Sequence, residues 1–465
     1  MSPRLASDLL EPALAALRQR FGDRLETGEA LRAQHAHSLT WVTPKLPDAV
    51  LFADDEADVV AAVEICRAHK LPIVPFGAGT SLEGQINAPR GGLSLDLSRM
   101  SRIVAVHQGD LDVVVEPGVT RKQLNEHLRD QGLFFPVDPG AEHASLGGMA
   151  STRASGTMAV RYGTMRENVL SLRAVMADGS VVTTARRARK SSAGYDLTRL
   201  LVGAEGTLGV ITELTLRVYG TPETILAAVC PFKTLEGACN TVIQAIQLGL
   251  GLARMELIDE LQIKGFNIHS GTSFAETPTL FLEFHGTPAG TAEQIATFRA
   301  IAEAEGALGF AQAATPEDRN RLWKARHDAY WSAKALKPGA DLFATDVCVP
   351  ISRLADCILE TRRDQEAHGI TAPLVGHVGD GNFHLVPLFD MKDAADLARI
   401  KAFTHRLVER ALAMGGTSTG EHGIGEGKMA YMAAEHGPGL AVMRAIKQAL
   451  DPDGLFNPGK MVPEA

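Results

Sequence analysis

The stretch PFGAGTSLEG, residues 75–84, decides the fold. Its first two residues end an apolar run that starts at Leu71. A short apolar run of this kind predicts a buried strand, here ending at Gly77. The small residues that follow allow several backbone N–H groups to point at one anion, which suits a pyrophosphate. The pattern is not a Rossmann fingerprint, because Leu82 stands where a third glycine is needed, and no lysine follows to make a P-loop. A tight strand–loop turn without a ligand is the alternative interpretation.

Two further segments are rich in glycine. Residues 136–168, PVDPGAEHASLGGMASTRASGTMAVRYGTMREN, hold almost no large apolar side chain. We expect a long loop without secondary structure, which in a compact domain is usually functional. Its backbone and hydroxyl donors suit an extended polar ligand. Residues 201–211, LVGAEGTLGVI, contain glycines that would let a flat ring or a sugar approach closely.

Composition narrows the class of protein. The chain has 465 residues, enough for two or three domains, and its 45% hydrophobic and 22% charged residues exclude a disordered or fibrous chain. The formal net charge is −9, and the one basic cluster, residues 186–190, is short, so nucleic acid is not an expected partner. The five cysteines form no Cys-x-x-Cys pair, which argues against a disulfide framework. We find no secretory signal and no transmembrane segment, and expect a cytoplasmic protein.

A cluster of histidines and carboxylates suggests a metal site. His377 and His384 flank the turn sequence Val-Gly-Asp-Gly-Asn-Phe, and Glu421 and His422 follow about 40 residues later. Turn residues can fold the two imidazoles toward one point. Two histidines and one carboxylate are a recognised ligand set for a divalent metal with open positions, and zinc, manganese and iron all fit it. A structural histidine pair is the alternative.

The three glycine-rich segments, in this order, closely resemble the PCMH-type FAD-binding domain of the vanillyl-alcohol oxidase superfamily. The C-terminal half resembles the FAD-linked D-2-hydroxy acid dehydrogenases, most closely the D-lactate dehydrogenase (cytochrome) branch. The segments that carry this second resemblance are TDVCVPISRL (345–354), GHVGDGNFH (376–384) and TGEHGIGEGK (419–428). Together the two resemblances cover the chain from about residue 44 to its end.

The resemblance implies a binding site for FAD. It assigns residues 75–84 to the pyrophosphate, and the other glycine-rich segments to the rest of the cofactor. Relatives with covalent flavin carry a histidine where this chain has Thr80, so we expect non-covalent FAD. An extra residue near His143 leaves the role of this histidine open. The residues assigned to FAD are Pro75, Gly77, Ala78, Gly79, Thr80, Ser81, Gly84, Pro139, Gly140, Ser145, Gly147, Gly148, Ser151, Ser155, Gly156, Tyr162, Gly163, Glu205, Gly206, Gly209, Ile211 and Asn457.

The resemblance also implies the roles of the active-site residues. His377, His384 and Glu421 would bind the metal, and His422 would be the general base. A metal on the substrate hydroxyl would lower its pKa, and a histidine titrates near neutral pH, so the chemistry agrees. Arg326 would pair with the substrate carboxylate, which its planar guanidinium matches. Asn382 is a further candidate for substrate contact, although it could equally serve the turn.

The expected fold class is α+β, with an FAD-binding domain and a cap domain built on an antiparallel sheet with flanking helices. We expect an N-terminal helical segment at 1–43, the FAD-binding domain at 44–220, the cap or substrate domain at 221–417, and a C-terminal segment at 418–465 that returns to the FAD domain. Within the FAD domain, residues 172–184 are predicted to form a hairpin that turns at Asp178-Gly179.

The predicted activity is oxidation of a D-2-hydroxy acid, D-lactate first, to the 2-oxo acid, with hydride passing to the flavin N5. D-2-hydroxyglutarate dehydrogenase and the flavin subunit of glycolate oxidase are alternatives, and a metal-dependent hydrolase is an alternative of a different class. Residues 342–346 offer no extra cation for a dicarboxylate, which favours a small monocarboxylate. The electron acceptor would be a cytochrome c, a quinone or an electron-transfer flavoprotein. A homodimer and peripheral contact with the inner membrane are further expectations.

Overall fold

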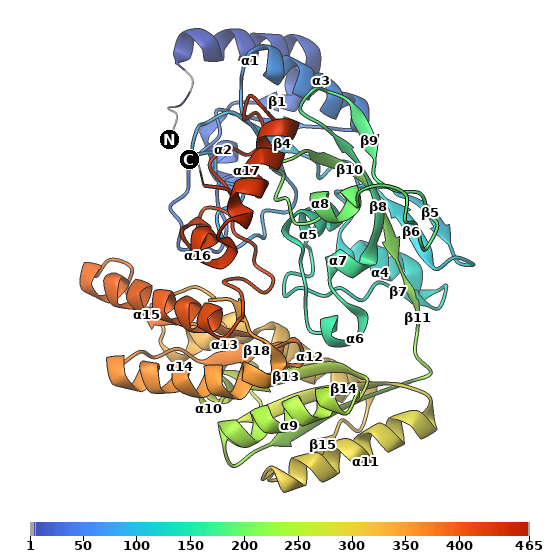
Figure 1. Ribbon diagram of the computed structural model, residues 1–465, viewed down its shortest axis with the longest axis vertical. Helices are drawn as coiled ribbons and strands as arrows, with labels where there is room; N and C mark the ends of the chain where they lie inside the picture. The colour runs from blue at the N-terminus through green and yellow to red at the C-terminus, as the bar shows by residue number, and fades with distance from the viewer. Residues whose placement is uncertain (1–3, 5, 464–465) are drawn as a thin grey trace. The chain divides into compact units, whose positions relative to one another are not determined.

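The computed structural model describes residue 4 and residues 6–463, and the contacts of the chain divide it into two units (Figure 1). Unit 1 comprises Met1–Ala154, Thr164–Gly220 and Glu421–Ala465, and unit 2 comprises Ser155–Gly163 and Thr221–Gly420. The chain therefore passes from one unit to the other four times. The expected α+β class is confirmed.

The first sheet of unit 1 holds the strand that precedes the 75–84 loop. Its order is β1-β2-β4-β3, and β2, β4 and β3 run parallel. Helix α1 packs against α3, and both contribute to a core with the apolar residues of the sheet. Leu9, near the start of α1, is 54% exposed and lies outside this core. The elements are α1 (Ser7–Phe21), η1 (Gly22–Arg24), β1 (Leu25–Glu26), α2 (Glu29–Gln34), β2 (Ala49–Phe52), α3 (Glu56–Ala68), β3 (Ile73–Phe76) and β4 (Leu93–Asp96).

The second sheet of unit 1 is antiparallel, in the order β5-β6-β10-β8-β9. The predicted hairpin is present, because β8 and β9 pair across the Asp178-Gly179 turn. The basic cluster is an exposed loop in which Arg187 pairs with Asp110 and Asp112. The elements are β5 (Ile103–His107), β6 (Asp112–Val115), α4 (Arg121–Arg129), β7 (Leu133–Phe134), α5 (Leu146–Thr152), α7 (Met165–Asn168), β8 (Val169–Val175), β9 (Val181–Thr183), α8 (Leu197–Leu201), β10 (Val210–Arg217) and β11 (Tyr219–Gly220).

The expectation of a long loop without secondary structure at 136–168 was wrong. The segment contains three short helices, α5, α6 (Ala159–Tyr162) and α7. Ser145 caps α5 by accepting a hydrogen bond from the Gly148 amide, and Thr164 starts α7 with a capping box that Glu167 completes. Short helices with good caps can form from small residues when they pack on a core, so composition alone misled the prediction.

The C-terminal segment of unit 1 ends against the first sheet. Residues after Leu450 form a turn that Asp451 holds by accepting from the Leu455 and Phe456 amides. The chain then pairs with β3, because Ile73 donates to Leu455 O and the Asn457 amide donates to Ile73 O. The tail therefore extends the sheet beside the 75–84 loop. The helices of this segment are η4 (Met429–Tyr431), α16 (Met432–His436) and α17 (Gly439–Leu450).

Unit 2 is built on a seven-stranded antiparallel sheet in the order β15-β12-β14-β13-β18-β19-β17. Helices α9, α11 and α14 form a layer against one face, and α10, α12 and α13 pack together on the other, where Trp323 joins the core (Figure 1). The strands are β12 (Thr224–Pro231), β13 (Leu252–Ile258), β14 (Thr279–Gly286), β15 (Ala311–Gln312), β17 (Val347–Cys348), β18 (Leu374–Gly376) and β19 (Asn382–Leu385), and β16 (Asp341–Leu342) pairs separately with β20 (Leu388–Phe389).

The helices of unit 2 are mostly capped as sequence rules predict, for example by Thr234 at α9 and Asp259 at α10. No helix in the part of the chain that the structure describes is long and apolar enough to cross a membrane. All five cysteines are free thiols. The helices are α9 (Leu235–Gln247), α10 (Glu260–Ser270), α11 (Pro288–Ala304), α12 (Pro316–His327), α13 (Ala329–Leu336), η2 (Ile351–Arg353), α14 (Leu354–His368), η3 (Val378–Asp380) and α15 (Ala394–Ala413).

Candidate functional site

The loop at 75–84 starts where β3 ends and packs on the segment that follows residue 136. A Cβ on Gly77 would lie 2.2 Å from Ser145 Oγ, so only glycine fits there. Gly79 has a φ of +68°, which glycine adopts without strain, and its neighbours Ala78 and Thr80 are exposed. The Ser81 hydroxyl is buried and has no hydrogen-bond partner among the described residues. An unpartnered buried donor beside a backbone turn fits a ligand that carries phosphate oxygens.

The third glycine-rich segment, residues 201–211, packs against the first, residues 75–84. A Cβ on Gly206 would come within 3.0 Å of the Pro75 ring, and one on Gly209 within 3.1 Å of Val175 O. Asn457 from the tail donates to Gln85 O at 3.1 Å and to Glu205 O at 2.8 Å. Four segments far apart in the sequence therefore meet in unit 1 around the 75–84 loop, as an extended cofactor requires.

Other residues assigned to FAD have different surroundings. A Cβ on Gly147 would meet Pro117 at 2.5 Å, so this glycine serves packing within unit 1, whereas one on Gly140 would meet nothing. His143 is exposed and pairs with Glu142 at 3.2 Å. The set Ser155, Gly156, Tyr162 and Gly163 belongs to unit 2.

The glycines of residues 420–428 make room for two carboxylates of unit 1. A Cβ on Gly423 would lie 2.4 Å from Glu205 Oε1, and one on Gly427 would lie 2.2 Å from Glu83 Oε2. The amides of Ile424 and Gly425 donate to the two oxygens of Glu205 at 2.6 and 2.7 Å. Burial raises the pKa of Glu205, against the lowering effect of these amides. The carboxylate thus anchors the segment that carries His422.

His422 lies beside carboxylates of unit 1. Its Nδ1 is 4.0 Å from Glu83 Oε1, and its Nε2 is 3.9 Å from Glu421 Oε1. Gln85 donates to His422 O at 2.8 Å and fixes the backbone. Glu83 also lies 3.5 Å from Lys428. His422 is therefore held between two carboxylates of unit 1, Glu83 and Glu421.

In unit 2 the two predicted histidines of the turn lie together. The ring centroids of His377 and His384 are 5.4 Å apart. His377 Nδ1 lies 2.8 Å from Glu256 Oε1, and His384 Nδ1 lies 2.9 Å from Thr345 O. A carboxylate and a carbonyl only accept, so both rings donate through Nδ1, and in the neutral tautomer that does so the lone pair is on Nε2. Histidines that bind a metal are commonly held in this way.

Glu256 joins His377 to Arg326. Its side chain is fully buried, and Oε2 accepts from Arg326 Nε at 2.7 Å while Oε1 faces the histidine. Arg326 is therefore neither a surface residue nor an isolated cation. Asp346 also connects two side chains. It accepts hydrogen bonds from Asn382 at 2.7 Å and from the Thr419 hydroxyl at 2.7 Å.

Gly420 brings the chain to this second cluster. A Cβ on Gly420 would lie 2.2 Å from Asn382 Nδ2 and 3.2 Å from Asp346 Oδ1. Asn382 also donates to Val347 O at 2.8 Å, so it fixes the turn whether or not it touches a ligand. Glu421 is the residue after Gly420, and the peptide bond limits how far it can be from the Asn382–Asp346 pair.

Sequence reasoning assigned no role to Glu83, Glu256 and Asp346, each of which lies beside a predicted site residue of its own unit. The signal for Glu256 was present, since it is the one acidic residue in the strand LARMELI. A charged side chain that is buried in a largely apolar strand needs a partner, and β13 has only one other charged residue, Arg254. Asp346 and Glu83 lay inside segments that had been recognised, but no role was assigned to either side chain.

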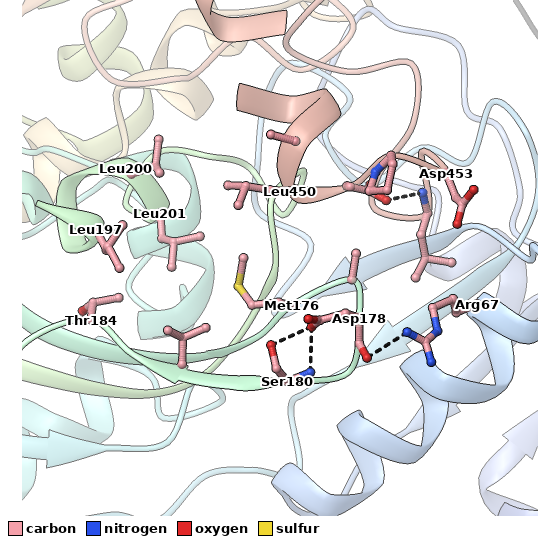
Figure 2. A pocket seen from close by; sticks show the side chains of 16 residues that line it. Arg67, Met176, Asp178, Ser180, Thr184, Leu197, Leu200, Leu201, Leu450 and Asp453 are labelled. Atoms are coloured by element: carbon pink, nitrogen blue, oxygen red, sulfur yellow. Dashed lines mark hydrogen bonds between the residues drawn. The ribbon is translucent and has the colours of Figure 1, made fainter. Parts of the chain in front are cut away.

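A separate pocket of about 470 Å³ lies in unit 1 and contains none of the predicted site residues (Figure 2). Its lining includes the leucines of α8, Leu450 at the end of α17 and Met176, and Arg67, which also lines it, donates to Asp178 O. The pocket is mainly apolar and offers no cluster of convergent catalytic groups.

Comparison with known proteins gives two family matches. Residues 221–461 match the family "FAD linked oxidases, C-terminal domain", and residues 47–185 match "FAD binding domain". A probable mitochondrial D-lactate dehydrogenase of Danio rerio is 50% identical over 97% of this chain and 92% of its own length. The mitochondrial D-lactate dehydrogenase [cytochrome] of Arabidopsis thaliana is 46% identical over 90% of this chain and 74% of its own. The glycolate oxidase subunit GlcD of Bacillus subtilis is 31% identical over 94% of both.

Solved structures of low identity share the fold. p-Cresol methylhydroxylase with bound substrate gives a TM-score of 0.83 at 17% identity, covering 98% of this chain and 97% of its own. A 4-ethylphenol oxidase from Gulosibacter chungangensis gives 0.80 at 18% identity, with the same coverage. The resemblance stated from the sequence motifs is confirmed by these matches.

Proposed function

The chain belongs to the FAD-linked oxidase family, and from that premise we propose that it is an FAD- and metal-dependent dehydrogenase that oxidises D-lactate to pyruvate. Relatives at 50% and 46% identity are named D-lactate dehydrogenases, which supports both the cofactor and the substrate. The observation that carries the metal is the pair His377 and His384, both of which have Nδ1 bonded to an acceptor and the lone pair on Nε2.

The residues of unit 1 fit FAD. The 75–84 loop, with its glycines and the buried Ser81 hydroxyl, would hold the pyrophosphate, and Thr80 leaves the flavin without a covalent bond. When bound, the flavin accepts a hydride from the substrate carbon. Gly206 and Asn457 support the loop from below, so they contribute through its position.

The metal would be held by His377, His384 and Glu421. Glu421 follows Gly420, which packs on Asn382 in the histidine cluster, so the chain supports its inclusion. Zinc, manganese and iron all accept two imidazoles and a carboxylate. A divalent ion supplies a positive charge that favours the alkoxide form of the substrate hydroxyl.

Three further residues would act on the substrate. His422 takes the hydroxyl proton as general base, with Glu83 nearby to favour its charged form. Arg326 pairs with the substrate carboxylate through N–H groups other than those that face Glu256. Asn382, fixed by Asp346, presents its amide toward the substrate.

The exact substrate and the electron acceptor are proposed from the names of relatives. D-2-Hydroxyglutarate and glycolate are the alternative substrates, and the glycolate oxidase subunit named above keeps glycolate open. The electron acceptor is proposed to be a cytochrome, because the names of relatives at 46% and 41% identity include one. A quinone or an electron-transfer flavoprotein, a peripheral position at the inner membrane and a homodimer are further hypotheses.

An anaerobic visible spectrum, recorded before and after D-lactate, tests the proposal. The purified protein should show a flavin band that D-lactate bleaches and L-lactate does not. His422→Ala should keep the band and lose the bleaching, because the base is removed and the cofactor site is intact. A band that D-lactate leaves unchanged would reject the substrate and direct the test to D-2-hydroxyglutarate and glycolate. A colourless protein that cannot be reconstituted with FAD would reject the whole proposal.

A further inference from the structure

Residues 155–163 cross from the FAD-binding unit into unit 2 and return, and we call them the strap. The residues before and after the strap, Ala154 and Thr164, belong to unit 1, while the strap itself belongs to unit 2. Ser155, Gly156, Tyr162 and Gly163 are among the residues proposed to contact FAD. The contacts that fix the strap on unit 2 therefore also determine the positions of these FAD-contacting residues.

Three contacts attach the strap to unit 2. Val160 packs against Gly379, where a Cβ would lie only 2.6 Å from Val160 Cγ2. Arg161 hydrogen-bonds to Gly251 O. The hydroxyl of Tyr162 lies 2.7 Å from His285 Nδ1. The first two use backbone or apolar surface, whereas the third engages a buried ionisable side chain.

His285 is itself held by a carboxylate. Its Nε2 is 2.8 Å from Glu283 Oε1, and Glu283 lies 3.7 Å from Arg254, whose guanidinium stacks 4.4 Å over Trp323. Burial raises the pKa of Glu283, but Arg254 and the hydrogen bond from His285 outweigh it and hold that pKa below its usual value. A carboxylate oxygen only accepts, so His285 donates through Nε2 to Glu283, and in this tautomer its Nδ1 is an acceptor.

The direction of the Tyr162 hydrogen bond follows. The phenol donates its one proton to His285 Nδ1, and its position is then fixed at both ends, by the strap backbone and by the ring. Glu283 and His285 are two residues apart on β14, so their side chains share one face of the sheet. A chain of oriented hydrogen bonds anchored in a sheet is a rigid support for a binding residue.

We propose that the Glu283–His285 pair is a positioning device that fixes Tyr162 and the strap for binding of the flavin. This inference rests on the proposed function, because it takes FAD as the ligand of the strap. Glu283 and His285 are positioning residues, since they act through Tyr162. Neither was identified from the sequence motifs.

The test is FAD affinity, measured by titrating the apoprotein of the full chain with FAD and following flavin fluorescence. Tyr162→Phe removes only the hydroxyl and should weaken FAD binding roughly fivefold to tenfold, because one hydrogen bond that holds the strap is lost. His285→Asn should have a similar effect. Because the chain acts as a unit, the double variant should bind FAD no more weakly than the weaker single variant.

Tyr330→Phe is the matched control. Tyr330 is another half-buried tyrosine of unit 2, and its hydroxyl donates to Leu342 O at 3.2 Å outside the strap. It should lose thermal stability comparable to Tyr162→Phe and keep wild-type FAD affinity. An effect that came only from stability would appear in both variants.

The outcomes separate this inference from the proposed function. If the wild-type protein binds FAD and D-lactate bleaches it, but Tyr162→Phe and His285→Asn bind FAD as the wild type does, the positioning role is rejected and the function stands. Additive losses in the double variant would also reject it, because independent contacts would then explain them. If the wild-type protein fails to bind FAD, the function itself is wrong.

Discussion

Two arginine–glutamate–histidine chains lie on one face of the sheet of unit 2, and they present opposite ring nitrogens. In the first chain, Glu256 connects Arg326 to His377 at Nδ1. In the second, Glu283 connects Arg254 to His285 at Nε2. Both sets contain the same residue types and both are buried. Glu256 faces Nδ1 of His377 and leaves Nε2 for another ligand, whereas Glu283 faces Nε2 of His285 and leaves Nδ1. The carboxylate thus decides which atom of the histidine remains for a ligand, the proposed metal at His377 and the Tyr162 hydroxyl at His285.

Replacing the histidine of each arginine–glutamate–histidine set should give the largest difference between the two sets. His377→Ala should lose the metal and at least about a thousandfold of activity, because a Lewis acid at the hydroxyl supplies several kcal/mol. The flavin band should remain, since the 75–84 loop is in unit 1. Metal content by elemental analysis and turnover with D-lactate give the measurement.

His285→Ala is the control for that prediction. It removes an imidazole of the same sheet face but should keep the metal at wild-type stoichiometry. If both variants lose the metal equally, the distinction between the two chains is contradicted.

The carboxylates give the next test, with a smaller expected effect. Glu256→Gln should weaken metal affinity about tenfold to a hundredfold, because the group that orients His377 loses its charge. It should also lower kcat/KM for D-lactate, since Arg326 then lacks its buried counter-charge. Competition with a metal chelator and steady-state kinetics measure the two effects. Glu283→Gln, matched in chemistry and burial, should leave metal affinity unchanged, and an equal loss there would argue against separate roles.

The sequence predicted the histidines of the first chain but not the carboxylates that orient them. His377 and His384 flank one short turn, so spacing alone brings them together. Glu256 is 121 positions from His377, and their contact depends on strands β13 and β18 being neighbours in the sheet. Pairing of distant strands is decided by the whole core, and one sequence does not reveal it. Glu283 and His285 escaped notice because an alternating polar pattern in a strand usually indicates a solvated face.

The glycine-rich segments show the same limit in unit 1. Their small residues correctly indicated places of close approach, as at Gly77 and Gly206, and the fold class followed from them. The glycines of 420–428, however, make room for Glu205 and Glu83 of the protein itself, a cause that the motif does not display. Helix α5 was missed because its cap, Ser145, was counted as a ligand donor, and the capping box of Thr164 and Glu167 that starts α7 was overlooked.

A third arginine–carboxylate pair, Arg362 and Asp259, is useful for comparison because no histidine among the described residues hydrogen-bonds to its carboxylate. Asp259 directly follows β13, is fully buried and pairs with Arg362 at 2.8 Å. Burial raises its pKa to about 6, although Arg362 and the Gln262 amide act against the rise. The folded protein therefore binds a proton here that the unfolded chain releases near pH 4, and this contribution to stability is lost as the pH rises through about 6.

Asp259→Asn should remove that pH dependence. The free energy of unfolding of the wild type, relative to the variant, should fall on the order of 2 kcal/mol between about pH 4 and pH 7. Urea unfolding at several pH values measures the difference, and the titrations common to both proteins cancel. A difference that stays flat, or that rises with pH, would mean that Arg362 keeps Asp259 ionised as the other two arginines keep Glu256 and Glu283 paired. An arginine alone would then be enough to keep a buried carboxylate ionised. The neighbouring histidine would be the only difference between the pairs of Glu256 and Glu283 and the pair of Asp259.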